Sequence, residues 1–228
     1  MSTLVFDLKY PEKFLFENVK VGKPETYGDT QSYPLMYYNT STNTEGIISI
    51  DFHPFIFMFG KTRAPFGVNT KAHLVDLTLG SKDNYEENPM YEFLSKWDGC
   101  LQDIVDTKLT GVDFEPTIQY SKKKVDGELV ENRDHGPHYT IGLHKRPNRS
   151  DGTFKYLFNV QGESGRLHEV FDAEGMISPG ALIQPACFMH SISVTKDVAR
   201  CRPKLQAVKI CDNIEINFDD DVRVFEEL

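Results

Sequence analysis

Cysteine is scarce in this sequence, and no two cysteines have the spacing of a metal-binding pair. The four cysteines are scattered along the chain without a C-x-x-C pair: Cys100, Cys187, Cys201 and Cys211. This spacing argues against a zinc-ligand set and against the disulfide framework of a small secreted domain. We therefore expect reduced thiols and an intracellular, reducing location.

Long hydrophobic runs are also missing. The longest apolar stretch, FHPFIFMFG at residues 52–60, is far shorter than the roughly 20 residues that a membrane-spanning helix needs. The first residues, MSTLVFDLKYPEKF, lack the basic and then apolar regions of a signal peptide. These residues predict neither membrane insertion nor secretion.

Catalytic motifs are equally absent. There is no H-E-x-x-H pair, no glycine-rich phosphate loop and no nucleophile elbow. A metal-dependent β-barrel enzyme is an alternative that would draw its ligands from the histidines and one glutamate, namely His135, His138, His144, Glu163, His168 and His190. Such a site needs these ligands to converge, and the H-x-x-H spacing with no H-x-H pair does not favour it. We predict no catalytic residue, no metal and no cofactor.

Aromatic residues, in contrast, are plentiful, with 16 Phe and 10 Tyr against one Trp. Aromatic side chains pack well on pleated sheets, and short alternating runs joined by Gly- and Pro-rich turns recur after residue 46. Strands are predicted in HLVDLTLG, EPTIQYSKKK, HYTIGLH, TFKYLFNV, GALIQPACFMHSISV and KLQAVKI. A turn is predicted at Asp126-Gly127 or slightly later. Residues 1–46 are rich in turns around one short strand at 33–38. The fold class predicted is β-rich α+β.

One segment is helical by its pattern. Apolar residues recur every three or four positions between residues 88 and 109, namely Met90, Phe93, Leu94, Trp97, Leu101, Ile104, Val105 and Leu109. Asn88 is the expected N-cap and Pro89 occupies the favoured first position. We expect this amphipathic helix to cover the sheet.

Charge is distributed unevenly. The chain carries a net charge of −9, of which residues 212–228 hold −6, leaving −3 for residues 1–211. A short acidic segment of this kind is typical of an interaction tail. Two basic segments stand out in the nearly neutral remainder, at residues 121–155 and 193–209.

The predicted hairpins combine aromatic rows with basic loops, as in YTIGLHKRPNRSDGTFKYLF at residues 139–158. This composition suits single-stranded nucleic acid, because bases stack on aromatic faces and cations follow the phosphates. Aromatic rows also commonly face a core, and basic loops commonly face water. A nucleic-acid-binding surface therefore requires the aromatic and the basic residues to lie on the same face of the protein.

The C-terminal third, GMISPGALIQPACFMHSISVTKDVARCRPKLQAVKICDN with its acidic, Phe-bearing tail, resembles the last barrel strands of phage replication single-stranded DNA-binding proteins. The longer layout, through APFGVN, HLVDLTL, the helix and PTIQYSKKK, is similar to the OB-fold single-stranded DNA-binding proteins of large nucleocytoplasmic DNA viruses. The likeness spans about residues 45–228. One departure is the last residue, Leu228, where the phage proteins end in an aromatic.

The resemblance implies an OB-like antiparallel barrel over residues 1–211 with an N-terminal elaboration, and an acidic tail over 212–228. It implies sequence-independent binding of single-stranded DNA in replication, recombination or repair, in host cytoplasm or nucleus or at a viral replication site. The tail would compete for the groove or dock replication proteins. The implied contacts are the stacking residues Tyr120, Tyr139, Tyr156 and Phe188, and the phosphate-binding residues Lys122, Lys124, Lys145, Arg146, Arg149, Lys155, Arg200 and Arg202.

A second class of function remains open from the sequence. A non-catalytic viral structural or assembly protein with a β-barrel or jelly-roll fold would also be rich in aromatics and poor in cysteine. Salt-dependent binding of an oligonucleotide separates the two classes. A homodimer formed through an exposed strand edge or the helix is also left open.

Overall fold

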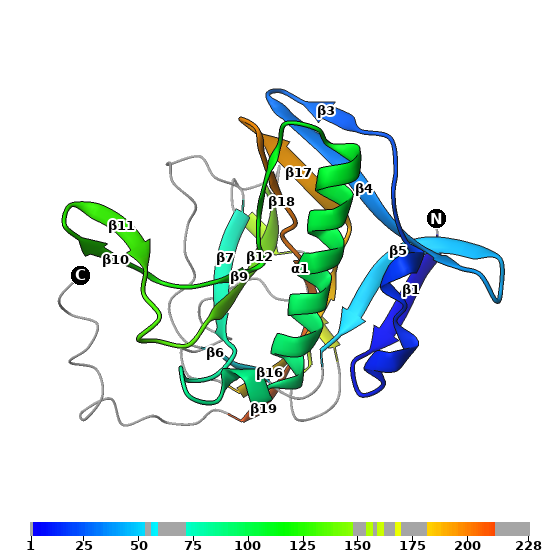
Figure 1. The fold of residues 1–228 in the computed structure, drawn as a ribbon. Helices are drawn as coiled ribbons and strands as arrows, with labels where there is room; N and C mark the ends of the chain where they lie inside the picture. Colours follow the sequence, from blue (N-terminus) through cyan, green and yellow to red (C-terminus); the bar gives the residue numbers. More distant parts are fainter. Residues whose placement is uncertain are drawn as a thin grey trace.

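The computed structural model describes residues 2–52, 56–58, 72–147, 154–156, 159–161, 167–169 and 182–212. Within these ranges the chain is mostly strand, with one long helix beside the sheet (Figure 1). The predicted β-rich α+β class is confirmed. No helix in the described ranges has the length and apolarity to cross a membrane.

The long helix α1 spans Pro89–Lys108, and three short 3-10 helices are η1 (Pro11–Lys13), η2 (Phe16–Asn18) and η3 (Tyr85–Glu87). The strands of the N-terminal half are β1 (Ser2–Asp7), β2 (Val19–Val21), β3 (Glu25–Tyr27), β4 (Thr30–Asn39), β5 (Thr44–Asp51), β6 (Ile56–Met58) and β7 (Ala72–Thr78). Those after the helix are β8 (Asp113–Glu115), β9 (Ile118–Gln119), β10 (Lys122–Val125), β11 (Glu128–Glu131), β12 (His138–Pro147), β13 (Phe154–Tyr156), β14 (Asn159–Gln161), β15 (Leu167–Glu169), β16 (Leu182–Phe188), β17 (Ser191–Thr195), β18 (Val198–Arg200) and β19 (Lys204–Asp212).

Helix α1 begins and packs as its sequence predicts. The Asn88 side chain accepts a hydrogen bond from the backbone N–H of Met90, which satisfies one of the free donors at the helix start. The apolar stripe is buried except for Ile104, which is partly buried, and Trp97 at its centre has no exposed surface. The helix therefore supplies one wall of the core.

The solvent face of α1 contains a glycine that the packing does not require. A Cβ added at Gly99 would meet nothing within 4 Å. Because glycine loses more backbone entropy than alanine in a helix, we expect Gly99→Ala to raise the free energy of unfolding by about 0.5–1 kcal/mol. Urea unfolding of the two proteins measures this, and a loss of stability in the variant would contradict the assignment of Gly99 to an open face.

The strand pairings form a circuit through five strands. β6 pairs with β7, β7 with β12, β12 with β19, β19 with β16, and β16 with β6. The pairing of β12 with β19 is parallel, with Gly142 opposite Lys204, and the other four are antiparallel. The circuit brings the start of β19 beside β12.

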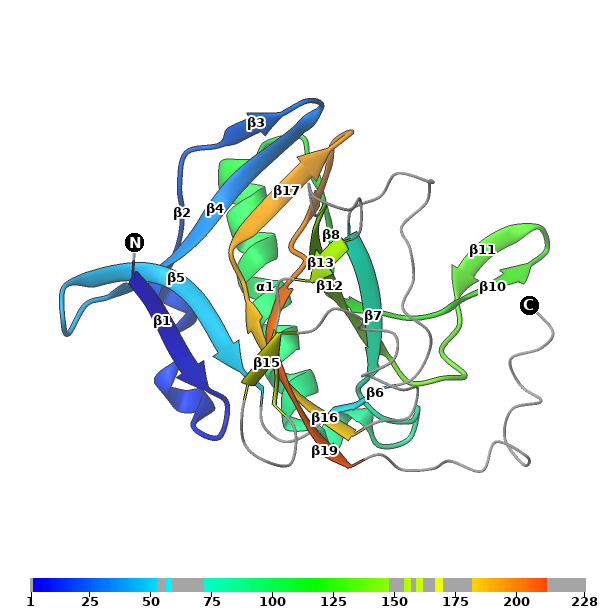
Figure 2. The same ribbon diagram turned by 180° about the vertical axis from the view of Figure 1, so that it is seen from behind.

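A second group of strands extends from the circuit. β3 pairs with β4, β4 with β17, β17 with β18, and β18 with β8. Helix α1 lies across one face of β4, β17 and β18, as both views show (Figures 1 and 2). Leu35, Ile192 and Ala199 from these strands are buried in the same core as Trp97. The other face of these strands is turned away from α1.

Strands β10 and β11 form a separate two-stranded hairpin, called the arm here, that projects from the body (Figure 1). Its turn is the predicted Asp126-Gly127 pair, with φ values of 51° and 92°. Positive φ at both central residues is what a two-residue hairpin turn needs, and glycine adopts it without strain. The turn prediction is confirmed.

One predicted stacking residue belongs to the core instead. Tyr139 on β12 has no exposed surface, and its ring lies 5.9 Å from that of Phe52. Strand alternation correctly groups Tyr139 with Ile141, but that face points inward. The prediction that Tyr139 stacks on a base is wrong, because no base can reach a fully buried ring.

Candidate nucleic-acid interface

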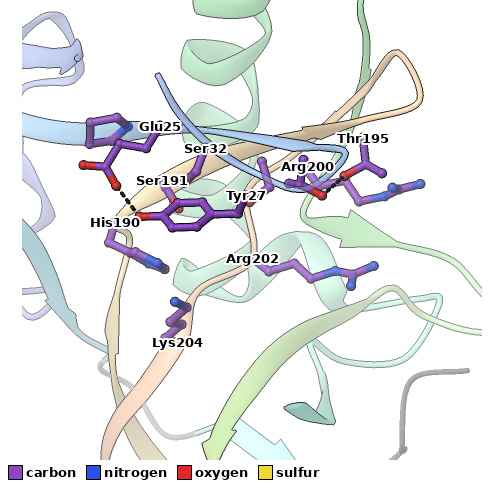
Figure 3. A pocket seen from close by; sticks show the side chains of 12 residues that line it. Glu25, Tyr27, Ser32, His190, Ser191, Thr195, Arg200, Arg202 and Lys204 are labelled. Atoms are coloured by element: carbon purple, nitrogen blue, oxygen red, sulfur yellow. Dashed lines mark hydrogen bonds between the residues drawn. The ribbon is translucent and has the colours of Figure 1, made fainter. Parts of the chain in front are cut away.

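A hollow of about 570 Å³ lies on the face of β4 and β17 turned away from α1 (Figure 3). Its lining comes from β3, β4, the β16–β17 junction, β17, β18, the link from β18 to β19 and the start of β19. We call it the groove, and its residues are Glu25, Tyr27, Thr30, Ser32, Pro34, His190, Ser191, Ser193, Thr195, Arg200, Arg202 and Lys204.

The floor of the groove consists of small polar side chains in strand register. Ser193 on β17 stands opposite Ser32 on β4, and Thr195 stands opposite Thr30. The Thr30 and Thr195 hydroxyls are 2.9 Å apart and hydrogen-bonded. Because side chains alternate along β17, the same strand buries Ile192 while turning its hydroxyls to the groove. Hydroxyl groups of this kind are common partners of phosphate and sugar oxygens.

One wall of the groove is anchored by an ion pair. Arg200 on β18 contacts the Glu115 carboxylate on β8 at 2.7 Å from both Nε and an Nη atom. The Arg200 hydrogen bond holds the pKa of Glu115 below its usual value, and Gln119 donates a further hydrogen bond to the same carboxylate. Arg200 is therefore held in place, with its charge partly compensated.

Two further cations continue this wall. Arg202 is exposed, and Lys204 is half-buried at the start of β19. Burial lowers the pKa of Lys204, because desolvation disfavours the charged form. In the part of the chain that the structure describes, neither forms an ion pair with a carboxylate. An anion entering the groove would find these two charges available.

The opposite wall carries an aromatic side chain. Tyr27 on β3 is 65% exposed, and its hydroxyl donates to Oε2 of Glu25 two residues earlier. The short turn that follows has Gly28 at φ 58°, a conformation that glycine adopts easily. Figure 3 shows the Tyr27 ring over the groove, facing the side from which Lys204 and Arg202 project. An exposed ring facing cations is the combination that single-stranded nucleic acid requires.

The structure places two of the predicted site residues, Arg200 and Arg202, in the groove. Phe188, at the end of β16, is half-exposed and pairs with Lys204 without lining the groove itself. Tyr120 lies elsewhere, 6.5 Å from Tyr85, with the guanidinium of Arg133 4.9 Å from its ring centre.

Lys122 and Lys124 are exposed on the arm, outside the groove, in a hairpin that also carries Glu128 and Glu131. The backbone of the predicted basic hairpin is described in part, with Lys145 opposite Tyr156 and Arg146 opposite Lys155 between β12 and β13. Its side chains, and Arg149 entirely, lie outside the described residues.

The sequence interpretation did not name Tyr27 or the hydroxyl floor. Lys204 lies in the basic segment 193–209 but was not named as a contact. The signal for the floor was present in HSISVT, where Ser191, Ser193 and Thr195 alternate with apolar residues. No pattern around Tyr27 predicts a place in the groove. Its strand β3 lies beside the groove because it pairs with β4, and that pairing is not visible in the local sequence.

The alternative of a metal-dependent enzyme needs a cluster of metal ligands, and the described residues contain none. No group of three His, Cys, Asp or Glu side chains there could hold a metal ion. The side chains of His144, Glu163 and His168 lie outside the described residues.

Comparisons with known proteins give a structural likeness. The sequence matches no protein-family model and no curated protein. Among solved structures, the single-stranded DNA-binding protein from bacteriophage Enc34 is similar with a TM-score of 0.41 and 11% identity, over 88% of this chain and 98% of that one. The same protein in complex with ssDNA gives a TM-score of 0.43 and 10% identity, over 86% and 97%.

Proposed function

We propose that this protein binds single-stranded DNA without dependence on sequence and without catalysis. The observation that carries the proposal is the groove, in which the exposed ring of Tyr27 faces Arg202 and Lys204 across a floor of hydroxyl groups. Bases stack on rings of this kind at about 1–3 kcal/mol each, and cations bind the backbone phosphates.

We infer that the fold is an OB-like barrel. The five-strand circuit through β6, β7, β12, β19 and β16 supports it, because the OB-fold is a partly open barrel of five strands. In this proposal residues 1–211 form one domain, and the β3–β4 hairpin is the N-terminal elaboration that adds the aromatic wall of the groove.

We infer that the polynucleotide continues from the groove along β12. Gly142 is level with Lys204, so Lys145 and Arg146 follow further along the same strand. In this proposal the hairpin residues Lys145, Arg146, Arg149, Lys155 and Tyr156 extend the contact beyond the groove. Phe188 would assist as the strand neighbour of Lys204.

We propose that the acidic tail competes with DNA for the groove or docks replication proteins. Residues 213–228 lie outside the described part, and Asp212 is the last residue of β19, where it pairs with Leu182. The tail carries most of the net charge, so its removal should strengthen the attraction of the body for DNA. Replication, recombination or repair, in a virus, is the setting proposed.

We also infer a reducing, intracellular location and a chain able to form homodimers. The described cysteines Cys100, Cys187 and Cys201 are free, and burial raises the pKa of the Cys201 thiol to about 12. Among the described pairings, β1 pairs only with β5, and Val5 on it is 60% exposed, which leaves a strand edge open to a second copy. Light scattering of the purified protein tests the dimer.

A titration tests the proposed function. Fluorescently labelled oligo(dT) is titrated with the full chain and with a chain that ends at Asp212, at about 50 and 200 mM salt. Both chains should bind, and the affinity should fall steeply with salt, because each phosphate contact on a single strand contributes about −0.7 to the slope of log K against log salt. The shortened chain should bind more tightly. If neither chain binds at the lower salt, the proposal fails and the structural or assembly role is favoured.

A further inference from the structure

The groove is electrically polarised across its width. One row of strand-paired residues crosses it from Glu25 on β3 through Ser32 and Ser193 to Arg200 on β18. Glu25 is the one carboxylate among the described residues that line the groove, and it stands at the end of the row farthest from Arg200. The cations Arg202 and Lys204 follow Arg200 along the chain.

This polarity fixes which part of a nucleotide lies on which side. Phosphates are repelled by Glu25 and attracted by Arg202 and Lys204, so the backbone runs along the cationic wall. The bases then extend across the hydroxyl floor toward Tyr27, whose ring offers a stacking surface. A base stacked there presents its polar edge close to Glu25.

The Glu25 carboxylate has one oxygen left for such a base. Oε2 accepts the hydrogen bond from the Tyr27 hydroxyl, which orients the carboxylate, and Oε1 has no hydrogen-bond donor among the described residues. An ionised carboxylate only accepts hydrogen bonds. Cytosine offers its N4 amino group as a donor at the position where thymine has the O4 acceptor.

We propose that Glu25 is a specificity-determining residue that favours cytosine over thymine at the groove. The cytosine amino group donates to Oε1, whereas the thymine O4 faces the carboxylate and is repelled. The inference rests on the proposed function, and it adds a compositional preference to binding that is otherwise independent of sequence. Tyr27 contributes by stacking and by holding Glu25 in position.

The test compares oligo(dC) with oligo(dT) of equal length on the wild-type chain, on Glu25→Gln and on Glu128→Gln. Glu128 is an exposed glutamate on the arm, so its substitution makes the same charge change outside the groove. Wild type should bind oligo(dC) about fivefold more tightly, the size expected of one partly exposed hydrogen bond to a charged group. Glu25→Gln should bring the ratio close to one, because an amide can donate to thymine as well as accept from cytosine. Glu128→Gln should keep the wild-type ratio.

A third oligonucleotide separates the hydrogen bond from the stacking strength of the base. N4,N4-dimethylcytosine retains the cytosine ring but has no N4 donor, so its oligomer should bind wild type like oligo(dT). Equal binding of oligo(dC) and oligo(dT) by wild type, or an unchanged ratio in Glu25→Gln, overturns the role of Glu25 and leaves the proposed function standing. Failure of wild type to bind either oligomer at low salt overturns the proposed function itself.

Discussion

Replacing Arg202 and Lys204 together by glutamine is expected to weaken binding of oligo(dT) about thirtyfold at about 50 mM salt. The two cations stand on one wall of the groove, and neither forms an ion pair with a described carboxylate. Arg202 also attracts the Glu115 carboxylate at longer range, but neither cation has to break an ion pair with a described carboxylate before it binds a phosphate. A charge-assisted hydrogen bond to an exposed phosphate contributes about 1 kcal/mol, and two of them account for most of the expected loss.

The salt dependence of binding is a second quantity that this double variant should change. Loss of two phosphate contacts should reduce the magnitude of the slope of log K against log salt by about 1.4. Fluorescence titrations at several salt concentrations measure both quantities. Arg200 is left intact in this variant, because its ion pair with Glu115 also joins β18 to β8.

Lys122 and Lys124 provide the matched control for that variant. Their replacement by glutamine removes the same two charges from the exposed arm, outside the groove. The effect on affinity should stay within about threefold, as expected of a long-range charge effect without direct contact. If the arm variant weakened binding as much as the groove variant, net charge rather than the groove would govern the affinity.

Asp98→Ala is expected to lower the free energy of unfolding by about 3 kcal/mol, because it leaves buried donors without an acceptor. Asp98 lies on α1, and its carboxylate accepts from the backbone N–H of Thr117 at 2.9 Å, from the Thr117 hydroxyl at 2.6 Å and from the N–H of Ile118 at 3.1 Å. These bonds join the helix to the segment that enters β9. Thr117 is 7% exposed, so water does not replace the lost acceptor easily.

Urea unfolding with two reference variants tests this role of Asp98. Asp98→Asn keeps one acceptor oxygen and should lose less stability than Asp98→Ala. Asp103→Ala removes an exposed carboxylate from the same helix and should change stability by less than about 0.5 kcal/mol. If Asp98→Ala lowered the free energy of unfolding by less than about 1 kcal/mol, the hydrogen bonds between α1 and the segment entering β9 would not be stabilising.

The helix and the arm turn could be predicted from sequence because their signals are local. The apolar periodicity and the Asn88–Pro89 start determine α1 without reference to the rest of the chain. The Asp126-Gly127 pair likewise carries its own backbone preference. Strand β12 was recognised by alternation, but alternation alone does not tell which face is buried, which is why Tyr139 was assigned wrongly.

The N-terminal strands and the groove could not be predicted in the same way. Strands β1 and β3 lie in a segment whose sequence predicts turns. They are strands because β1 pairs with β5 and β3 pairs with β4. The groove depends on the pairing of β4 with β17, in which Ser32 stands opposite Ser193 although the two are far apart in sequence. Arg200 and Arg202 lie in a segment that the sequence marks as basic, and the resemblance implied them as contacts. The position of Tyr27 opposite them is a consequence of that long-range pairing.

Ultraviolet crosslinking of oligo(dT) to the full chain, followed by peptide mapping, tests the central claim most directly. If the groove holds the unpaired strand, crosslinks should fall on the β3–β4 peptide that contains Tyr27 and on the segment from His190 to Lys204. Crosslinks confined to the arm at residues 122–131, with none in those two segments, would contradict the account.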